Sequence, residues 1–311
     1  MAKYLVTGGA GFIGSHIVEA LVAQGETVRV LDDLSTGKAA NLAPLGNRVE
    51  LVQASVCDLV AVEKAVQGVD CIFHEAALAS VPRSIERPLD THQVCVTGTV
   101  NLLHAAQRAK VRRVVYAASS SAYGNSNWAS KRESDMPAPL SPYAAAKLAA
   151  ELYCQAFFHS YGLETICIRY FNVFGPRQDP NGPYAAVIPC FINQMLAGQA
   201  PQIFGNGQQS RDFTYVQNIV HGNLLASQAP GVGGQVFNVA MGQSTSLLSL
   251  VAAINKLLGT NFKPSFAEPR VGDVRDSLAD ISSAERVLKY APSVSFLEGL
   301  ARTVEDLKQR R

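Results

Sequence analysis

Apolar residues in the first part of the chain fall into short runs that alternate with longer segments of helical spacing. Six runs bounded by turn residues predict strands: KYLV (3–6), TVRVL (27–31), VELVQ (49–53), CIFH (71–74), RVVYAA (113–118) and TICIRYF (165–171). Helical spacing marks residues 12–24, 59–67, 90–110 and 142–161. Because such alternation builds parallel strands with crossover helices on both faces, we predict an α/β fold with a doubly wound (Rossmann) sheet.

The alternation ends near residue 171. Proline and glycine become frequent there, as in FGPRQDPNGP and APGVGG, and short strands mix with helices. The run QVFNVA (235–240) is predicted to return to the large sheet. We therefore predict a Rossmann domain over residues 1–170, to which the chain returns near 212–240, and a smaller α/β region over 171–311.

A glycine-rich loop follows the first predicted strand. In TGGAGFIG, Gly8, Gly11 and Gly14 open the next helix, where glycines let the backbone turn tightly and approach a pyrophosphate at the positive end of the helix. The second strand leads into Asp32, about 20 residues further on, whose carboxylate can accept hydrogen bonds from both ribose hydroxyls of a dinucleotide. Because this carboxylate would repel a 2′-phosphate, the loop predicts NAD rather than NADP.

Composition narrows the classes of partner. The 311 residues are 48% hydrophobic, enough for a large core, and the 27 basic and 25 acidic side chains are interspersed. Without a basic block, no nucleic acid partner is expected. With no apolar run of membrane-spanning length and no signal-peptide pattern, we expect a cytoplasmic protein with no membrane partner. The six cysteines lack ligand spacing, so we predict reduced, structural thiols and no metal site.

A tyrosine and a lysine stand one helical turn apart in SPYAAAK (141–147). Tyr143 and Lys147 share a helix face, so the ammonium could lie near the phenol oxygen and lower its pKa. Tyr143 would then be a usable base. An ordinary helix surface can show the same spacing in a chain with ten tyrosines, so the pair gains meaning only from the other motifs.

Together, the Gly-x-x-Gly-x-x-Gly loop, the Tyr-x-x-x-Lys pair and the serines of AASSSAYG resemble the extended short-chain dehydrogenase/reductase family. The resemblance continues through DDLSTG, HEAALASVPRS, RYFNVFGPRQDPNG, SRDFTYV and PRVGD. It is strongest to UDP-hexose 4-epimerases of the UDP-N-acetylglucosamine/UDP-glucose type. Two positions depart from the family pattern: Ser55 stands where most members hold the adenine with an aspartate, and Cys95 replaces an asparagine before Gly98. Both changes concern cofactor contacts and helix packing.

The resemblance implies a catalytic set of Tyr143, Lys147 and Ser119. Lys147 would bind the nicotinamide ribose and stabilise a tyrosinate, while Ser119 would hydrogen-bond the phenol oxygen. The implied NAD-binding residues are Gly8, Gly11, Phe12, Ile13, Gly14, Asp32, Ser35, Thr36, Gly37, Val56, Ala76, Tyr143, Lys147 and Tyr170.

The resemblance also implies a UDP-sugar site in the smaller region. Arg211, Arg270 and Asn172 would hold the diphosphate, and Asp273 the uridine ribose. Ala186 and Val187 of YAAVIP (184–189), with Phe204, would lie along the uracil. The implied contacts to the sugar are Ser80, Ser120, Ser121 and Ser277. Epimerases confined to unacetylated sugars carry a bulky tyrosine at the position of Ser277, whereas serine leaves room for an N-acetyl group.

The predicted reaction is reversible epimerisation at C4 of a UDP-hexose, acetylated or plain, through a 4-keto intermediate with tightly bound NAD. Related dehydratases carry an Asp-Glu pair after the catalytic threonine, and related decarboxylases a nearby glutamate. SSSAYG contains no carboxylate, which favours simple epimerisation.

Three other expectations complete the picture. Another NAD-dependent nucleotide-sugar modifier, such as a uronate epimerase or a reductase, is the alternative enzyme. The alternative of another class is a non-enzymatic NAD-sensing protein, although such relatives have lost the Tyr-Lys pair. A homodimer is expected because family members pair the helices equivalent to 90–110 and 142–161 into a four-helix bundle.

Overall fold

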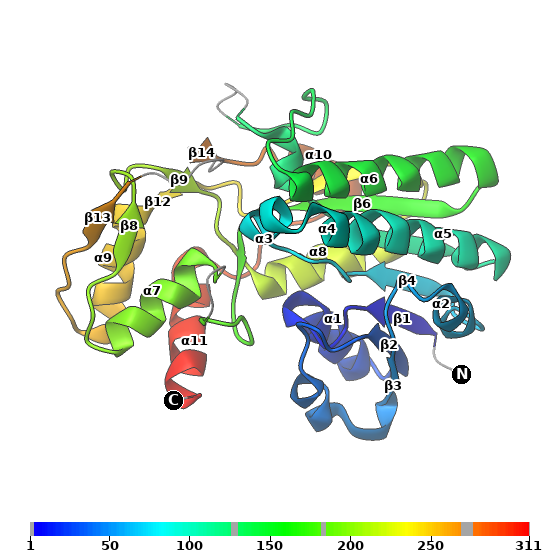
Figure 1. The fold of residues 1–311 in the computed structure, drawn as a ribbon, viewed down its shortest axis with the longest axis horizontal. Coiled ribbons are helices and arrows are strands. Elements are labelled where there is room, and N and C mark those ends of the chain that lie inside the picture. Colours follow the sequence, from blue (N-terminus) through cyan, green and yellow to red (C-terminus); the bar gives the residue numbers. More distant parts are fainter. Residues whose placement is uncertain (1–2, 126–129, 182–184, 269–275, 311) are drawn as a thin grey trace.

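The computed structural model describes residues 3–125, 130–181, 185–268 and 276–310. Its centre is a seven-stranded sheet in the order β11-β6-β5-β4-β1-β2-β3, in which every pairing is parallel (Figure 1). The strands are β1 Tyr4–Thr7, β2 Val28–Asp32, β3 Val49–Gln53, β4 Cys71–His74, β5 Arg113–Ser119, β6 Glu164–Tyr170 and β11 Val236–Val239. The predicted doubly wound sheet is confirmed, including the return of the chain through QVFNVA.

Two helical layers cover the sheet because successive side chains of a strand point to opposite faces. On β1, Val6 packs into a core shared with α1 (Phe12–Ala23) and α8 (Val216–Gln228). The preceding residue, Leu5, packs into the opposite core with α2 (Leu59–Ala65), α5 (Gly98–Arg108) and α6 (Pro142–Tyr161). Strands buried on both faces account for the nearly continuous apolar runs in the sequence.

The helix α6 carries the Tyr-Lys pair and has well-defined ends. Ser141 caps its first turn by accepting a hydrogen bond from the Ala144 amide at 3.2 Å, and Pro142 occupies the first helical position. Gly162, with a φ of 71°, ends it in the left-handed region that favours glycine. The Ser-Pro start predicted from the sequence is therefore where the helix begins.

The segment predicted as one helix over 90–110 has three parts. These are α4 (Pro88–His92), a π-helical segment (Gln93–Thr97) and α5. In a π-helical turn the backbone hydrogen bonds join residues five apart instead of four apart. Just after this segment, the Thr99 hydroxyl donates to the Cys95 carbonyl at 2.7 Å. Apolar spacing alone does not distinguish this local widening from a regular helix.

A smaller lobe lies beside the sheet, on the left of Figure 1. Its core is formed mainly by α7 (Val187–Leu196), α9 (Leu247–Leu258) and α11 (Phe296–Gln309). Short strands pair around it: β7 Val173–Phe174 with β10 Thr214–Tyr215, β8 Gln202–Phe204 with β13 Ser265–Ala267, and β9 Ser210–Arg211 between β12 Thr245–Ser246 and β14 Asp276–Ser277. The remaining elements are α3 Val81–Glu86, α10 Ser282–Leu288 and the 3₁₀ turns at Ala39–Asn41, Ala43–Arg48 and Ser120–Tyr123.

The chain enters the first lobe a second time over α10, later than the predicted return at 212–240. Ala284 and Leu288 of this helix join the core formed with α1 and α8, as does Tyr290 just beyond it. The Tyr290 hydroxyl donates to the Ala240 carbonyl after β11 at 2.9 Å. The two lobes are therefore joined by several crossings of the chain.

Two sequence expectations concern the whole chain. Across the described ranges, no helix is both long enough and apolar enough to cross a membrane. All six cysteines are free; Cys57 and Cys190 are half-buried and the other four are buried. Their positions agree with the prediction of structural thiols.

Candidate active site

The glycine loop lies where β1 ends and α1 begins. Gly8 has a φ of 68°, and a Cβ placed there would lie 2.7 Å from the Ala76 amide nitrogen in the loop after β4. A Cβ on Gly14 would collide with the Gly8 carbonyl. The start of α1 has no side-chain cap, so the amides of its first turn are available to a ligand. These features fit a dinucleotide pyrophosphate approaching the backbone.

Asp32 ends β2 beside this loop and is 7% exposed. Its carboxylate accepts hydrogen bonds from the Ala10 amide at 2.9 Å and the Leu34 amide at 2.8 Å. A Cβ on Gly37 would lie 2.9 Å from both carboxylate oxygens. Burial raises the pKa of Asp32, whereas the two amide bonds lower it. The two bonds fix the orientation of the carboxylate beside the glycine loop.

The predicted catalytic residues come together at the carboxyl edge of the sheet. Ser119, the last residue of β5, forms a side-chain hydrogen bond with Tyr143 on α6. The Ser119 Oγ lies 2.8 Å from the Ser121 Oγ and accepts from the Ser121 amide. The Lys147 Nζ lies over the Tyr116 ring, 4.5 Å from its centre. Ser119 therefore lies beside Tyr143, and the catalytic roles of both residues stay predictions.

The electrostatics of Tyr143 differ from the simple expectation of a lowered pKa. Burial and then Cys95 raise the pKa of Tyr143, and the Ser119 hydrogen bond lowers it by less. Burial also lowers the pKa of Lys147, which is 3% exposed. The side chains around Tyr143 therefore favour the neutral phenol, since their desolvation outweighs the stabilisation that they give to a tyrosinate.

A glutamate that the sequence analysis did not select stands beside this group. The Tyr170 hydroxyl, at the end of β6, donates to the Glu75 Oε1 at 2.8 Å. Tyr170 in turn accepts from the Asn223 Nδ2 at 2.8 Å. Burial raises the pKa of Glu75 to about 7. The signal in the sequence was a carboxylate directly after a buried strand, in CIFHEAA.

A buried ion pair holds α6 on the sheet, and it was also missed. Glu151 and Arg169 are 2% and 3% exposed, with the Arg169 Nη2 2.6 Å from the Glu151 Oε1 and the Nε 2.9 Å from Oε2. The guanidinium also lies 4.6 Å from the centre of the Tyr123 ring. Glu151 follows Lys147 by one turn, so this bidentate contact fixes the helix close to the Tyr-Lys pair. A single arginine within the apolar strand TICIRYF was the available signal.

Three residues proposed to contact the substrate meet between the lobes. Asn172, with a φ of 31°, directs its Nδ2 toward the Ser277 Oγ at 3.5 Å. Arg211 of β9 stands opposite Ser277 in the pairing with β14. Asp212 fastens this region, because its carboxylate accepts from the amides of Met241, Gly242 and Ala279. Burial raises the pKa of Asp212 to about 6.

The other predicted site residues are distributed around these groups. Ser80 caps α3 through the Arg83 amide, and Ser120 and Ser121 form the 3₁₀ turn after Ser119. Ala186 precedes α7, Val187 begins it, and Phe204 ends β8. Arg270, Asp273 and Tyr184 lie outside the described residues. Ser55 accepts from the Cys57 amide at 3.2 Å, so its hydroxyl serves a local turn.

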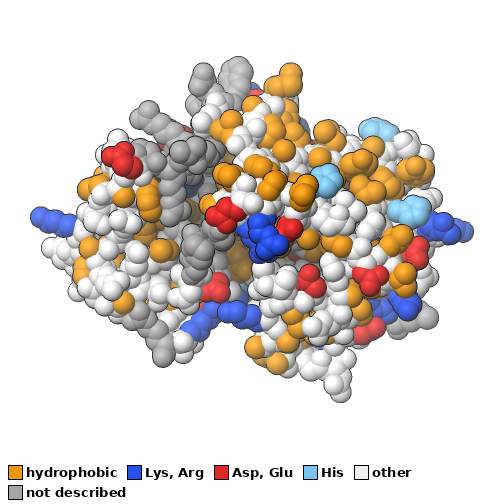
Figure 2. Space-filling model, in the orientation of Figure 1, with side chains coloured by type: hydrophobic (Ala, Val, Ile, Leu, Met, Phe, Trp, Pro, Cys, Tyr) orange, Lys and Arg blue, Asp and Glu red, His pale blue; other side chains and the backbone are white. Residues whose placement is uncertain are grey.

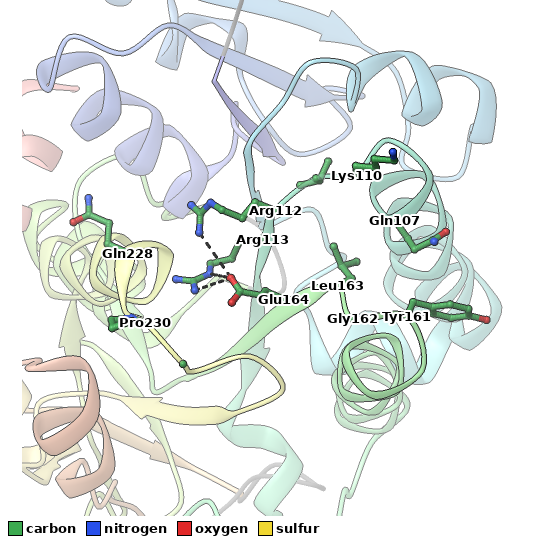
Figure 3. Close-up of a pocket in the computed structure, with 12 residues that line it drawn as sticks. Gln107, Lys110, Arg112, Arg113, Tyr161, Gly162, Leu163, Glu164, Gln228 and Pro230 are labelled. Atoms are coloured by element: carbon green, nitrogen blue, oxygen red, sulfur yellow. Dashed lines mark hydrogen bonds and ion pairs between the residues drawn. The ribbon is translucent and has the colours of Figure 1, made fainter.

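A cavity of about 770 Å³ lies at the opposite edge of the sheet (Figure 3). Its arginines are engaged by neighbours: Arg113 donates to Glu164 at 2.8 Å, and Arg112 lies 3.6 Å from Asp70. Because β5 and β6 begin here, the cavity faces away from the glycine loop and Tyr143. In a parallel doubly wound sheet, ligands bind at the carboxyl ends of the strands, so the functional site is not in this cavity.

The sheet, the glycine cradle and the Ser-Tyr-Lys group define a dinucleotide-dependent enzyme of the doubly wound α/β class. The model of the NAD-dependent epimerase/dehydratase family matches residues 4–240. The chain belongs to this family, and its cofactor is NAD.

Several relatives match along almost the whole chain. A UDP-glucose 4-epimerase from Mycolicibacterium smegmatis is 42% identical over 316 residues, with 99% of each chain covered. A UDP-glucuronate 4-epimerase from Thermodesulfobacterium geofontis is 34% identical, covering 99% of this chain and 97% of its own length. The solved structure of a UDP-N-acetylglucosamine 4-epimerase from Methanobrevibacter ruminantium, in complex with UDP-N-acetylmuramic acid, is 40% identical with a TM-score of 0.95. It covers 100% of this chain and 99% of its own.

Proposed function

We propose that this protein, an isomerase of the NAD-dependent UDP-sugar 4-epimerase class, interconverts the C4 epimers of UDP-N-acetylhexosamines and also accepts the unacetylated UDP-hexoses. The observation that carries the proposal is the hydrogen bond between Ser119 and Tyr143 beside Lys147, at the sheet edge that also holds the glycine loop and Asp32. A proton acceptor and a hydride acceptor can therefore meet at one sugar carbon.

The chemistry divides between cofactor and protein. When bound, NAD would be held by the glycine loop and Asp32, and it would supply hydride transfer to and from C4 of the sugar. Tyr143 takes the proton from the C4 hydroxyl and later returns it. Ser119 orients the phenol through its hydrogen bond, and the Lys147 ammonium favours the tyrosinate. Since burial raises the pKa of Tyr143, the positive charge of the nicotinamide must supply part of this stabilisation.

The anchor of the rotating sugar is proposed to be the UDP group. Arg211 and Asn172 stand at the junction of the lobes next to Ser277, where a diphosphate can be held while the sugar turns. Arg270 and Asp273 complete this anchor in the proposal. Ser277 is small, and in the proposal it faces C2 of the hexose, where a small side chain would admit an N-acetyl group.

A side-by-side assay tests the proposed substrate. UDP-N-acetylglucosamine, UDP-glucose and UDP-glucuronate are supplied separately, and formation of each C4 epimer is followed. We expect conversion of the first two, with the acetylated sugar preferred. Conversion of the uronate alone would contradict the proposal and favour a uronate epimerase.

We expect the purified protein to contain NAD and to need none added. The hydride is returned within each cycle, so the cofactor is regenerated and can remain bound. The measurement is NAD released on denaturation, compared with turnover before and after adding NAD. Stoichiometric consumption of added NAD with accumulation of NADH would instead indicate a net dehydrogenase.

We also propose a homodimer that pairs α4–α5 and α6 with their copies. Figure 2 shows hydrophobic side chains gathered over these helices, and Leu89, Leu152 and Tyr153 are 82%, 54% and 45% exposed. The family's four-helix bundle would cover such a face. Light scattering at micromolar concentration is expected to give twice the chain mass.

A charge placed on this face tests the dimer. Leu152→Arg is expected to give a monomer because the guanidinium would be buried unpaired between helices. The matched control is Leu297→Arg on α11, whose leucine is 61% exposed and lies away from the proposed face. Dissociation by both variants, or by neither, would contradict the proposed interface.

A further inference from the structure

A directional chain of hydrogen bonds crosses the carboxyl edge of the sheet. The Asn223 Nδ2 donates to the Tyr170 oxygen at 2.8 Å and also to the Ile219 carbonyl at 2.9 Å. The Tyr170 hydroxyl then donates to the Glu75 Oε1 at 2.8 Å. The Asn223 Oδ1, at 3.1 Å, is a second and more distant acceptor for the same hydroxyl. The shorter contact is the one to Glu75, where the phenol proton stabilises a negative charge.

Glu75, at the end of this series of hydrogen bonds, lies at the same edge of the sheet as Tyr143 and Lys147. Glu75 follows β4, whose neighbour β5 ends at Ser119, and Tyr170 stands opposite Ser119 in the pairing of β5 with β6. The neighbouring His74 ring packs on Tyr116, the ring beneath the Lys147 ammonium. Glu75 interacts electrostatically with both Lys147 and Tyr143.

On the basis of the proposed function, we propose that Glu75 is a tuning residue whose carboxylate, oriented by Tyr170 and Asn223, sets the pH at which Tyr143 becomes a base. Nothing in the carboxylate-free stretch SSSAYG provides this charge; it reaches the site from the loop after β4. Glu75 needs no contact with the reacting atoms for this role.

The direction of the effect follows from the charges. A negative Glu75 raises the pKa of Tyr143 and also that of Lys147. The other titratable groups facing the pair stay neutral: burial raises the pKa of the Cys95 thiol, and it lowers the pKa of His74 to about 3. Burial also raises the pKa of Tyr170. Glu75, with a pKa of about 7, is thus the group whose charge changes near neutral pH.

Glu75→Gln tests the inference because an amide oxygen can still accept from Tyr170 while the charge is removed. We expect the acidic limb of the kcat profile, which reports ionisation of Tyr143, to move about 0.5–1 pH unit lower. Ultraviolet titration of tyrosinate, taken as the difference between each protein and its Tyr143→Phe counterpart, should show the same shift. Glu305→Gln, at an exposed position of α11, makes an equal change in net charge and should shift neither curve.

An unchanged or upward-shifted limb in Glu75→Gln, at normal NAD content and melting temperature, would overturn the inference. If that variant fails to fold, Glu75→Asp tests the same charge with a shorter side chain. Because the negative charge is kept, the acidic limb of its kcat profile should stay at the wild-type pH. A limb that moves to lower pH in Glu75→Asp contradicts the proposal. A different result would contradict the proposed function, namely that the wild-type protein converts no UDP-sugar. The spectral titration still reports the effect of Glu75 in that case.

Discussion

Tyr143→Phe should reduce epimerisation on the order of 10³-fold while leaving the fold and the bound NAD intact. The substitution removes only the hydroxyl that is proposed to take the sugar proton and that bonds Ser119, and positioned acid–base groups contribute about 10²–10⁴-fold to rates. Lys147→Ala should give a comparable loss, since it removes the ammonium that is proposed to favour a tyrosinate. The measurement is kcat on UDP-N-acetylglucosamine and UDP-glucose at saturating substrate.

The same helix offers a matched control. Tyr161 ends α6 and is 60% exposed, so Tyr161→Phe makes an identical chemical change far from the sheet edge and should leave kcat within about twofold. Thermal melting and NAD content establish that each variant is folded. Near-normal turnover by folded Tyr143→Phe would exclude the proposed base and with it the mechanism.

Ser277→Tyr should abolish conversion of UDP-N-acetylglucosamine while conversion of UDP-glucose persists. Ser277 is 9% exposed and lies against Asn172 at the junction of the lobes, so a tyrosine ring there must project into the space proposed for the C2 substituent. Added bulk rejects a ligand by steric clash, and a selectivity change of at least 10²-fold is expected. The measurement is the ratio of kcat/KM for the two substrates.

Two further variants separate the effect of added side-chain volume at position 277 from loss of the hydroxyl and from a tyrosine added elsewhere. Ser277→Ala removes the hydroxyl without adding volume and should retain the acetylated substrate. Ser265→Tyr adds the same ring on exposed β13 and should leave the ratio unchanged. An equal decrease in kcat/KM for both substrates in Ser277→Tyr, or a decrease for neither, would mean that Ser277 does not determine whether an acetylated sugar is accepted. The role of Ser277 would then be its contact with Asn172 alone.

The sequence was sufficient for the sheet and for the cofactor loop. Short apolar runs bounded by turns predicted the strands because buried parallel strands have no polar face, and the glycines and Asp32 are adjacent to strand ends, where local rules apply. The start of α6 also follows from local rules, because a serine cap and a proline mark it. The four-residue spacing of Tyr143 and Lys147 places both side chains on one face of the helix.

Only the tertiary structure decided what surrounds that pair. Glu75 directly follows β4, Tyr170 ends β6 and Asn223 lies on α8. They are up to 148 positions apart in sequence, and only the tertiary packing makes them neighbours. The ion pair of Arg169 and Glu151 likewise joins β6 to α6. Burial, followed by Cys95, reverses the simple expectation for Tyr143 by raising its pKa, because a pKa depends on desolvation by every neighbour rather than on one lysine a turn away. Sequence spacing determines which residues share a face, and long-range packing determines the environment that tunes them.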